Sequence, residues 1–312
     1  MSVTTISHIP VIDLTDSFSP DIETRRKVAA EIRKAARDTG FFYVSGHGVP
    51  DEIIEKTFAV GKTFFDKPLD EKMKVLGPGG GFGYDPAQGQ VLDAGTPPDL
   101  KEGFMRGVPT HPLAPKVTYP EDMPEMEEIT REYLDQMIAL GRRIFHCIAL
   151  SLDLPEDYFD DGLDLPIAQT RLLKYTPKPA DAPDNQLGAG AHTDWGALTF
   201  LYQDDVGGLE IKDPEGNWIP ATPVPGTFVV NLGDLIRRWT NDQYRSTLHR
   251  VVNRKDQERD RYSIATFFDA RYDYPVSCVP TCLPESGEPL YSPCTVGEHI
   301  LMKMEESYSV AS

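Results

Sequence analysis

Cysteine is scarce in this chain, with four residues in 312: Cys147, Cys278, Cys282 and Cys294. No C-x-x-C pair and no histidine at zinc-finger spacing accompanies them, so we expect reduced thiols in place of disulfides or structural zinc. The sequence also lacks an apolar run of about 18 residues that could span a bilayer. Its first residues lack a basic segment followed by an apolar signal core, and we therefore expect a cytoplasmic protein.

Positive charge is also in short supply. Lys and Arg number 31 against 49 Asp and Glu, which gives a formal net charge of −18 at pH 7. Because nucleic acids and anionic membrane surfaces bind clustered Lys and Arg, we expect neither as a partner. The hydrophobic content of 40% is enough for a large core, and no internal repeat or interdomain linker is evident. We therefore expect one domain over residues 1–312.

The spacing of apolar residues differs between the two halves of the chain. Residues 20–39, a stretch from Pro50 onward and residues 121–152 have helical periodicity, which predicts helices that brace a sheet. Residues 76–117 are rich in Gly and Pro with interleaved aromatic residues, which favours a lid over a site. From about residue 166, short apolar runs alternate with turn signals, as in an antiparallel sandwich or barrel.

Two histidines and an aspartate form the main candidate site. His192 and Asp194 are two residues apart, and side chains at that spacing in an extended strand point to the same side. His249 begins another apolar stretch that can lie alongside as a neighbouring strand. Two imidazoles and one carboxylate are the ligand set of mononuclear non-haem Fe(II) oxygenases, which keeps other positions open for co-substrate and O₂. Solvated or core polar residues are the alternative for so short a pattern.

An Arg-x-Ser pair follows this group. Arg261 and Ser263 begin an apolar strand 12 residues after His249, and they share one face of it. A guanidinium offers paired donors that match two carboxylate oxygens, and a nearby hydroxyl adds a further donor. The pair is therefore a candidate clamp for a carboxylate group. A surface arginine at a strand edge is the alternative.

The segments around these residues resemble a known family, the 2-oxoglutarate- and Fe(II)-dependent oxygenases of the isopenicillin N synthase type. The matching segments in the second half of the chain are 174–177, 191–199, 207–210, 217–220, 229–234, 239–241 and 244–251. In the first half they are 9–14 and 40–49, with shorter matches at 64–65, 83–84 and 101–102. The resemblance covers nearly the whole length, which argues against a grafted catalytic module.

The resemblance implies a fold and an activity. The fold is a mixed α+β structure with a double-stranded β-helix, or jelly roll, over about 166–295, a helix-rich half over 1–165 and a C-terminal helix over 296–309. His192, Asp194 and His249 are then ligands of Fe(II), and Arg261 and Ser263 hold the distal carboxylate of 2-oxoglutarate. Such an enzyme uses O₂ to oxidise an unactivated C–H bond of a small molecule, by default to a hydroxyl. It decarboxylates 2-oxoglutarate to succinate and CO₂.

Other expected contacts come from family positions. Tyr175 is a candidate contact of the oxoacid, with a structural role in the core as the alternative. Asn231 and Asp234 are expected to support the turn and the ligands from behind. Six residues are expected to line a small and partly apolar substrate pocket: Phe82, Tyr84, Phe104, Met105, Arg106 and Phe267.

Three alternatives from other classes remain at this point. An oxidase like isopenicillin N synthase uses the same three ligands without an oxoacid, and its Arg-x-Ser pair binds the substrate. A non-catalytic ligand-binding relative could keep the fold as a sensor, but it has no need for an open iron face together with an oxoacid clamp. A zinc hydrolase can have the same ligand types, but it leaves Arg261 without a role.

Overall fold

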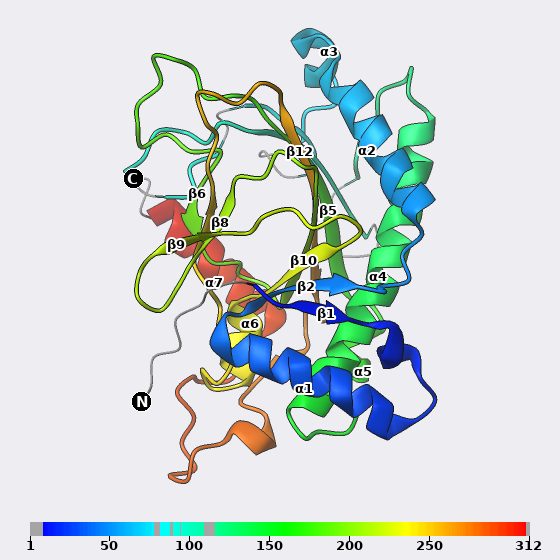
Figure 1. The fold of residues 1–312 in the computed structure, drawn as a ribbon, viewed down its shortest axis with the longest axis vertical. Helices are drawn as coiled ribbons and strands as arrows, with labels where there is room; N and C mark the ends of the chain where they lie inside the picture. Colours follow the sequence, from blue (N-terminus) through cyan, green and yellow to red (C-terminus); the bar gives the residue numbers. More distant parts are fainter. Residues whose placement is uncertain (1–8, 78–81, 88–89, 94, 109–115, 310–312) are drawn as a thin grey trace.

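Two β-sheets packed face to face form the centre of the molecule (Figure 1). The computed structural model describes residues 9–77, 82–87, 90–93, 95–108 and 116–309. Within them, an eight-stranded sheet and a four-stranded sheet enclose a shared apolar layer, and helices cover the outer face of the larger sheet. The expected mixed α+β jelly roll is confirmed.

The larger sheet takes strands from both halves of the chain, and every paired neighbour in it is antiparallel except β1 and β2. In spatial order its strands are β1 (Val11–Asp13), β2 (Phe41–Ser45), β10 (Phe228–Leu232), β7 (Leu198–Gln203), β12 (Arg261–Asp269), β5 (Ile167–Tyr175), β4 (Glu102–Gly107) and β3 (Gly83–Asp85). The smaller sheet consists of β6 (Ala189–His192), β11 (His249–Val251), β8 (Leu209–Lys212) and β9 (Trp218–Pro220). A separate pair is formed by β13 (Pro275–Val276) and β14 (Cys294–Thr295).

The helices lie close to where the apolar periodicity predicts them. They are α1 (Ile22–Asp38), α2 (Asp51–Phe65), α3 (Leu69–Met73), α4 (Glu125–Ser151), α5 (Asp160–Leu163), α6 (Asp234–Trp239) and α7 (Val296–Ser309), with 3₁₀ turns η1 (Thr15–Phe18) and η3 (Pro280–Cys282). The Asp21 carboxylate caps the start of α1 by accepting hydrogen bonds from two backbone N–H groups of its first turn. Gly40 follows its end at φ +67°, a conformation that favours glycine. The expected helices are confirmed.

Strand alternation divides the apolar residues of the larger sheet between its two faces. In β12, Ile264 and Phe268 face the helices, whereas Ala265 belongs to the layer between the sheets. The helix-side cluster packs against α2 and α4, which lie along this face in Figure 1. The inter-sheet layer is smaller and includes partly exposed members such as Phe267. Polar groups that face this layer therefore lie where a ligand can reach them.

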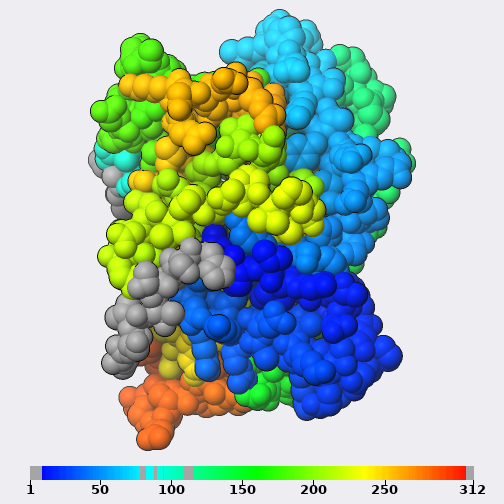
Figure 2. Space-filling model, in the orientation of Figure 1, coloured from blue at the N-terminus to red at the C-terminus, as the bar shows by residue number. Residues whose placement is uncertain are grey.

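The first half of the chain does more than brace the core. Strands β1 and β2 extend one edge of the larger sheet, and β4 and β3 extend the other. In the space-filling view, the blue N-terminal residues adjoin the yellow-green residues of the second half directly (Figure 2). The boundary near residue 165 thus divides the sequence, while the two segments on either side share one sheet.

The Gly- and Pro-rich segment differs from the expected lid. Its residues 102–107 form β4, which pairs with β5 along six consecutive residue pairs, so this part belongs to the sheet. Residues 78–81, 88–89, 94 and 109–115 of the expected lid lie outside the described residues. Glycine and proline content marks loops locally, whereas the pairing of β4 with β5 spans more than sixty residues of sequence.

The contact between α4 and the larger sheet generates a stability prediction. A Cβ atom at Gly141 would lie 2.6 Å from the ring of Phe268, so Gly141→Ala should lower the free energy of unfolding by about 1–3 kcal/mol. This loss should exceed the gain of about 1 kcal/mol in helix propensity. Denaturant unfolding measures it. Gly61→Ala in α2 is the matched control, because its Cβ would meet only the end of the Leu172 side chain, at 3.3 Å. Equal effects of the two variants would contradict the prediction.

Candidate metal centre

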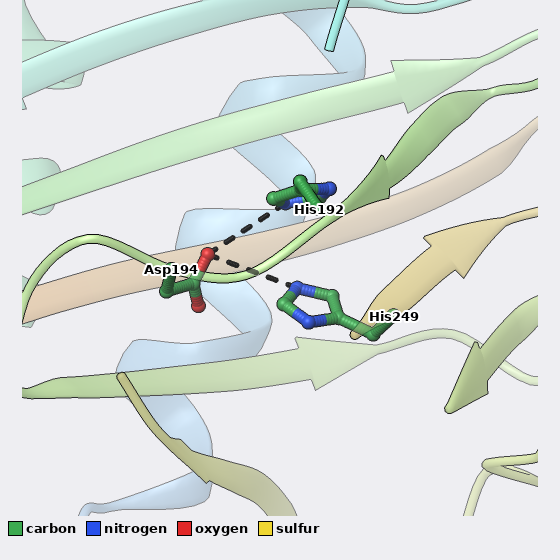
Figure 3. A group of neighbouring side chains, drawn as sticks. All are labelled: His192, Asp194 and His249. Carbon is green, nitrogen blue, oxygen red and sulfur yellow. Dashed lines mark ion pairs between the residues drawn. The ribbon is translucent and has the colours of Figure 1, made fainter. Parts of the chain in front are cut away.

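The two histidines lie opposite each other on neighbouring strands. His192 ends β6 and His249 begins β11, and the two are paired residues of this antiparallel ladder. Asp194 lies just beyond the end of β6, and its backbone carbonyl accepts a hydrogen bond of 2.8 Å from the Asp234 N–H. The end of β6 and the irregular chain directly after it, instead of a continuous strand, therefore bring His192 and Asp194 to the same side (Figure 3).

The three side chains converge on one point. One donor atom from each of His192, Asp194 and His249 lies within 4.8 Å of the others. The Nε2 atoms of His192 and His249 lie 3.6 and 3.7 Å from the same oxygen, Oδ1 of Asp194. The ring centroids of the histidines are 4.3 Å apart. This spacing suits three ligands of a single ion.

Backbone carbonyls determine which ring nitrogens face the centre. Nδ1 of His192 donates to the Gly190 carbonyl oxygen at 2.7 Å, and Nδ1 of His249 donates to that of Thr247 at 3.1 Å. In a neutral imidazole, a protonated Nδ1 leaves the Nε2 lone pair free. Both lone pairs therefore point toward Asp194, as metal coordination requires.

The protonation states agree with this assignment. Burial lowers the pKa of His192 to about 3, so its ring is neutral at physiological pH. Burial opposes the ionisation of Asp194, but the imidazoles of His249 and His192 and hydrogen bonds from Asn231 and Thr199 outweigh it and lower the pKa. A neutral ring at His192 and an ionised carboxylate at Asp194 are the protonation states in which these two residues bind a divalent ion.

Two neighbours hold the Asp194 carboxylate from behind. The Asn231 side-chain amide donates to Oδ2 at 2.7 Å, and the Thr199 hydroxyl donates to the same oxygen. Both bonds leave Oδ1 directed at the histidines. Asn231 was expected to support the site, whereas Thr199 on β7 was not identified from the sequence. Asp234 acts through its backbone N–H on the Asp194 carbonyl and ion-pairs with Lys303 of α7 at 3.0 Å.

The loop after Asp194 has two further anchors that sequence reasoning missed. The buried Asp269 carboxylate accepts a hydrogen bond from the Ala197 N–H, and burial raises the pKa of Asp269 to about 7. From α7, Nε2 of His299 donates to the Trp195 carbonyl oxygen at 2.9 Å. A carboxylate and a histidine that bond to a backbone have no local sequence signature, because their partners lie far away along the chain.

A buried guanidinium lies on the face of the larger sheet that is directed at the smaller sheet. Arg261 is 1% exposed, and it donates to the Gln203 side-chain oxygen at 3.0 Å and to the Ser263 hydroxyl at 3.3 Å. Its guanidinium carbon lies 4.8 Å from the ring centroid of Tyr175. Within the described residues it makes no ion pair with a carboxylate, and its Nε atom has no hydrogen-bond partner. An anionic ligand would compensate a buried cation in this state.

These observations meet the needs of both expected cofactors. The donor set of His192, Asp194 and His249 fits Fe(II), and the orphaned donor of Arg261 fits one carboxylate of 2-oxoglutarate. Gln203 was missed from the sequence, although it follows Thr199 at even spacing along β7 and lies opposite Ser263 of β12. Alternate residues of a strand share a face, so Thr199 and Gln203 could both have been identified once the inward face of β7 was known.

The expected substrate residues divide between the two faces of the sheet. Phe267 contacts the inter-sheet layer, a Cβ at Gly107 would touch the Phe82 ring, and Met105 shares this face of β4 with Gly107. Tyr84 and Phe104 instead belong to the helix-side core.

Two contacts confirm the separation from the metal ligands. The Tyr84 hydroxyl donates to Glu102 at 2.7 Å, and Arg106 donates to the Glu127 carbonyl oxygen of α4 at 3.2 Å. The structure therefore does not bring Tyr84, Phe104 and Arg106 to the metal ligands, because neighbouring residues of a strand point to opposite faces.

The arrangement as a whole defines a class of protein. Neutral imidazoles and a carboxylate suit a mononuclear Fe(II) centre with open positions, and an unpaired guanidinium nearby suits a dicarboxylic co-substrate. The class is that of the non-haem Fe(II) oxygenases that depend on an oxoacid.

Comparisons with known proteins identify the family. Residues 167–270 match the 2OG-Fe(II) oxygenase superfamily, and residues 9–126 match the N-terminal region of non-haem dioxygenases in morphine synthesis. A 2-oxoglutarate-Fe(II) type oxidoreductase of Emericella nidulans is 35% identical over 320 residues, which cover 97% of this chain and 91% of that protein. A homoarginine-6-hydroxylase of Oryza sativa subsp. japonica is 34% identical, covering 95% and 96%.

A solved structure agrees with these relatives. The crystal structure of a full-length Neurospora crassa protein in complex with α-ketoglutarate and thymine superimposes with a TM-score of 0.86 at 30% identity, covering 96% of this chain and 97% of that one. The chain belongs to the 2-oxoglutarate- and Fe(II)-dependent oxygenase family. It is a dioxygenase that uses Fe(II), 2-oxoglutarate and O₂, and the comparisons favour this activity over the oxoacid-independent and non-catalytic alternatives.

Thr199→Val removes one of the two hydrogen bonds to Asp194 with little change in volume. We expect Fe(II) affinity to fall by about 10–100-fold, because partners that orient a metal ligand contribute this much. Anaerobic titration with Fe(II) measures it. Thr170→Val is the matched control, since the Thr170 hydroxyl bonds to Thr266 at 3.0 Å on the helix-side face. A loss of affinity in both variants, or in neither, would remove Thr199 from the site.

Arg261→Met removes the buried cation while keeping an apolar side chain of similar length. The affinity for 2-oxoglutarate should fall by at least about 30-fold, because breaking a buried charge pair costs about 2 kcal/mol or more. The protein without ligands should not lose stability, since the cation has no carboxylate partner there. Isothermal titration and thermal unfolding test both points. Arg259→Met is the control, because Arg259 is exposed and pairs with Asp205; a similar loss in that variant would contradict the assignment.

Proposed function

We propose that His192, Asp194 and His249 hold the Fe(II) of this dioxygenase and that Arg261 and Ser263 bind the distal carboxylate of 2-oxoglutarate. The observation that carries this proposal is the buried guanidinium of Arg261, which lacks a carboxylate partner among the described residues. Tyr175 contributes its ring face to Arg261, at 4.8 Å from the guanidinium carbon, and so fixes the plane of the clamp.

Each residue has a distinct task in the proposed reaction. Asp194 cancels one of the two charges of the ion, so one positive charge remains to attract the keto-acid end of 2-oxoglutarate. Arg261 and Ser263 neutralise the opposite end and set its orientation. Fe(II) held by these residues would supply the oxidising chemistry together with O₂, and 2-oxoglutarate would be converted to succinate and CO₂. Burial of Arg261 and His249 keeps water from both ends of the co-substrate.

The substrate is proposed to be a small, partly apolar molecule that is hydroxylated at an unactivated C–H bond. Phe82, Met105 and Phe267 support this, since they lie on the inner side of the larger sheet. The named relatives support the size: one is a homoarginine hydroxylase, and the Neurospora crassa structure contains thymine.

The proposed location is the cytoplasm. All four cysteines are free thiols, and burial raises the pKa of Cys147 to about 12, which suppresses its reactive thiolate. Among the described residues, no helix has the length and apolar character to cross a membrane.

Anaerobic visible spectroscopy tests the proposed centre. Adding 2-oxoglutarate to the Fe(II) protein should produce a metal-to-ligand charge-transfer band, and His249→Ala or Asp194→Ala should abolish it because each removes a ligand. His146→Ala is the control, since His146 pairs with Asp160 at 2.7 Å on the surface of α4. Succinate formation in air gives the second readout. A band that survives Asp194→Ala would refute the ligand assignment, and iron binding without a band would favour the oxoacid-independent oxidase.

A further inference from the structure

A short segment before β4 is attached along the strand that carries His192. Residues 98–101, here termed the strap, bond to the chain just before β6 and just after β11. The Leu100 N–H donates to the Leu187 carbonyl oxygen at 2.8 Å, and the Gln186 side chain donates to the Pro98 carbonyl oxygen at 2.9 Å. The Asn253 side chain donates to the Leu100 carbonyl oxygen at 3.1 Å.

The strap contains a buried ion pair. Nζ of Lys101 donates to Oδ2 of Asp99 at 2.7 Å, and the two side chains are only 4% and 1% exposed. Burial lowers the pKa of Lys101 to about 8, although Asp99 opposes the shift. Removing two charges from water costs free energy that their attraction does not always recover, so such a pair is weak evidence of a role in stability. The Lys101–Asp99 pair is therefore expected to have a role other than stabilising the fold.

The other carboxylate oxygen of Asp99 is connected to His192 through the backbone of Gly190. Oδ1 accepts a hydrogen bond of 2.9 Å from the Gly190 N–H, and the Gly190 carbonyl oxygen accepts the 2.7 Å bond from Nδ1 of His192. Three consecutive bonds thus run from Lys101 through Asp99 and Gly190 to His192.

Gly190 needs this partner because the ladder is irregular there. His192 pairs with His249 and Ala189 pairs with Val251, so two residues of β6 lie opposite the single Arg250 of β11. Such a bulge leaves a residue out of regular pairing. β6 is also an edge strand of the smaller sheet, so no further strand supports its other side. The Asp99 carboxylate accepts the Gly190 N–H where another strand would otherwise do so.

We propose that Asp99 is a positioning residue of the metal centre, which holds the bulged Gly190 so that its carbonyl orients His192. The inference rests on the proposed role of His192 as a metal ligand. Lys101 holds the Asp99 carboxylate in place, so the pair acts through the backbone and touches neither metal nor substrate. A purely structural pair would stabilise the fold without affecting the metal.

The test replaces both charges together. Asp99→Ala alone would leave the Lys101 ammonium buried and unpaired, so the informative variant is the double change Asp99→Ala and Lys101→Met. Apolar replacement of a whole buried pair is often neutral or stabilising. The probe is Co(II), titrated anaerobically without 2-oxoglutarate and followed by its visible ligand-field spectrum, with thermal unfolding of the metal-free protein measured in parallel.

We expect the double variant to fold with unchanged or raised melting temperature and to bind Co(II) about 10–100-fold more weakly, with an altered spectrum. Asp99→Asn combined with Lys101→Met should stay close to the wild type, since the amide oxygen still accepts the Gly190 N–H and no buried ammonium is left unpaired. Gln186→Ala is the matched control, because it loosens the strap at Pro98 and leaves Asp99 in place. Its Co(II) affinity should remain within about twofold of the wild type, far less than an oriented ligand's partner contributes.

Several results would overturn the proposal. Wild-type Co(II) affinity in the double variant would show that the pair does not position His192, and failure of that variant to fold would show a structural role. An equal loss in Gln186→Ala would assign the effect to docking of the whole strap, and an equal loss in the variant with Asp99→Asn and Lys101→Met would assign it to charge. If the wild-type protein bound no Co(II), the proposed metal centre itself would fail, which is a different outcome from any of these.

Discussion

The site depends on two buried charged side chains that, in the part of the chain that the structure describes, have no oppositely charged side chain as a partner. Within the described residues, Asp194 has no Lys or Arg partner and Arg261 has no Asp or Glu partner. Each is held by neutral groups instead: Thr199 and Asn231 around the carboxylate, and Gln203 among those around the guanidinium. Such charges persist in a folded interior only when the surrounding structure imposes them. An ion and a dicarboxylate bound as proposed would compensate both charges.

These two charges lie on the opposite face of the larger sheet from the apolar core that stabilises the fold. The helix-side core contains the larger share of the buried apolar residues, including Phe268 and Ile264 of β12. The alternate residues Arg261 and Ser263 of the same strand face the other way. One strand therefore contributes to the apolar core on one face and to the proposed ligand site on the other. Substitutions at neighbouring positions should for this reason have unrelated consequences.

The sequence predicted those parts of the site that are defined by local spacing. His192, Asp194 and the Arg261–Ser263 pair could be identified from their spacing. The family resemblance then supplied the expected role of each residue. The prediction of substrate-pocket residues failed at Phe104 and Arg106, because only the register of β4 against β5 decides which alternate residues face inward.

The same limit explains the residues that were missed. Asp99 and Asp269 act on backbone N–H groups 91 and 72 residues away, so no window of sequence contains both partners. Each histidine, in contrast, takes its orienting carbonyl from the residue two positions earlier in the chain. The two rings are therefore oriented locally, whereas the Asp194 carboxylate depends on Asn231 of β10 and Thr199 of β7. Substitutions in β7 or β10 can therefore displace this carboxylate while both imidazoles stay correctly oriented.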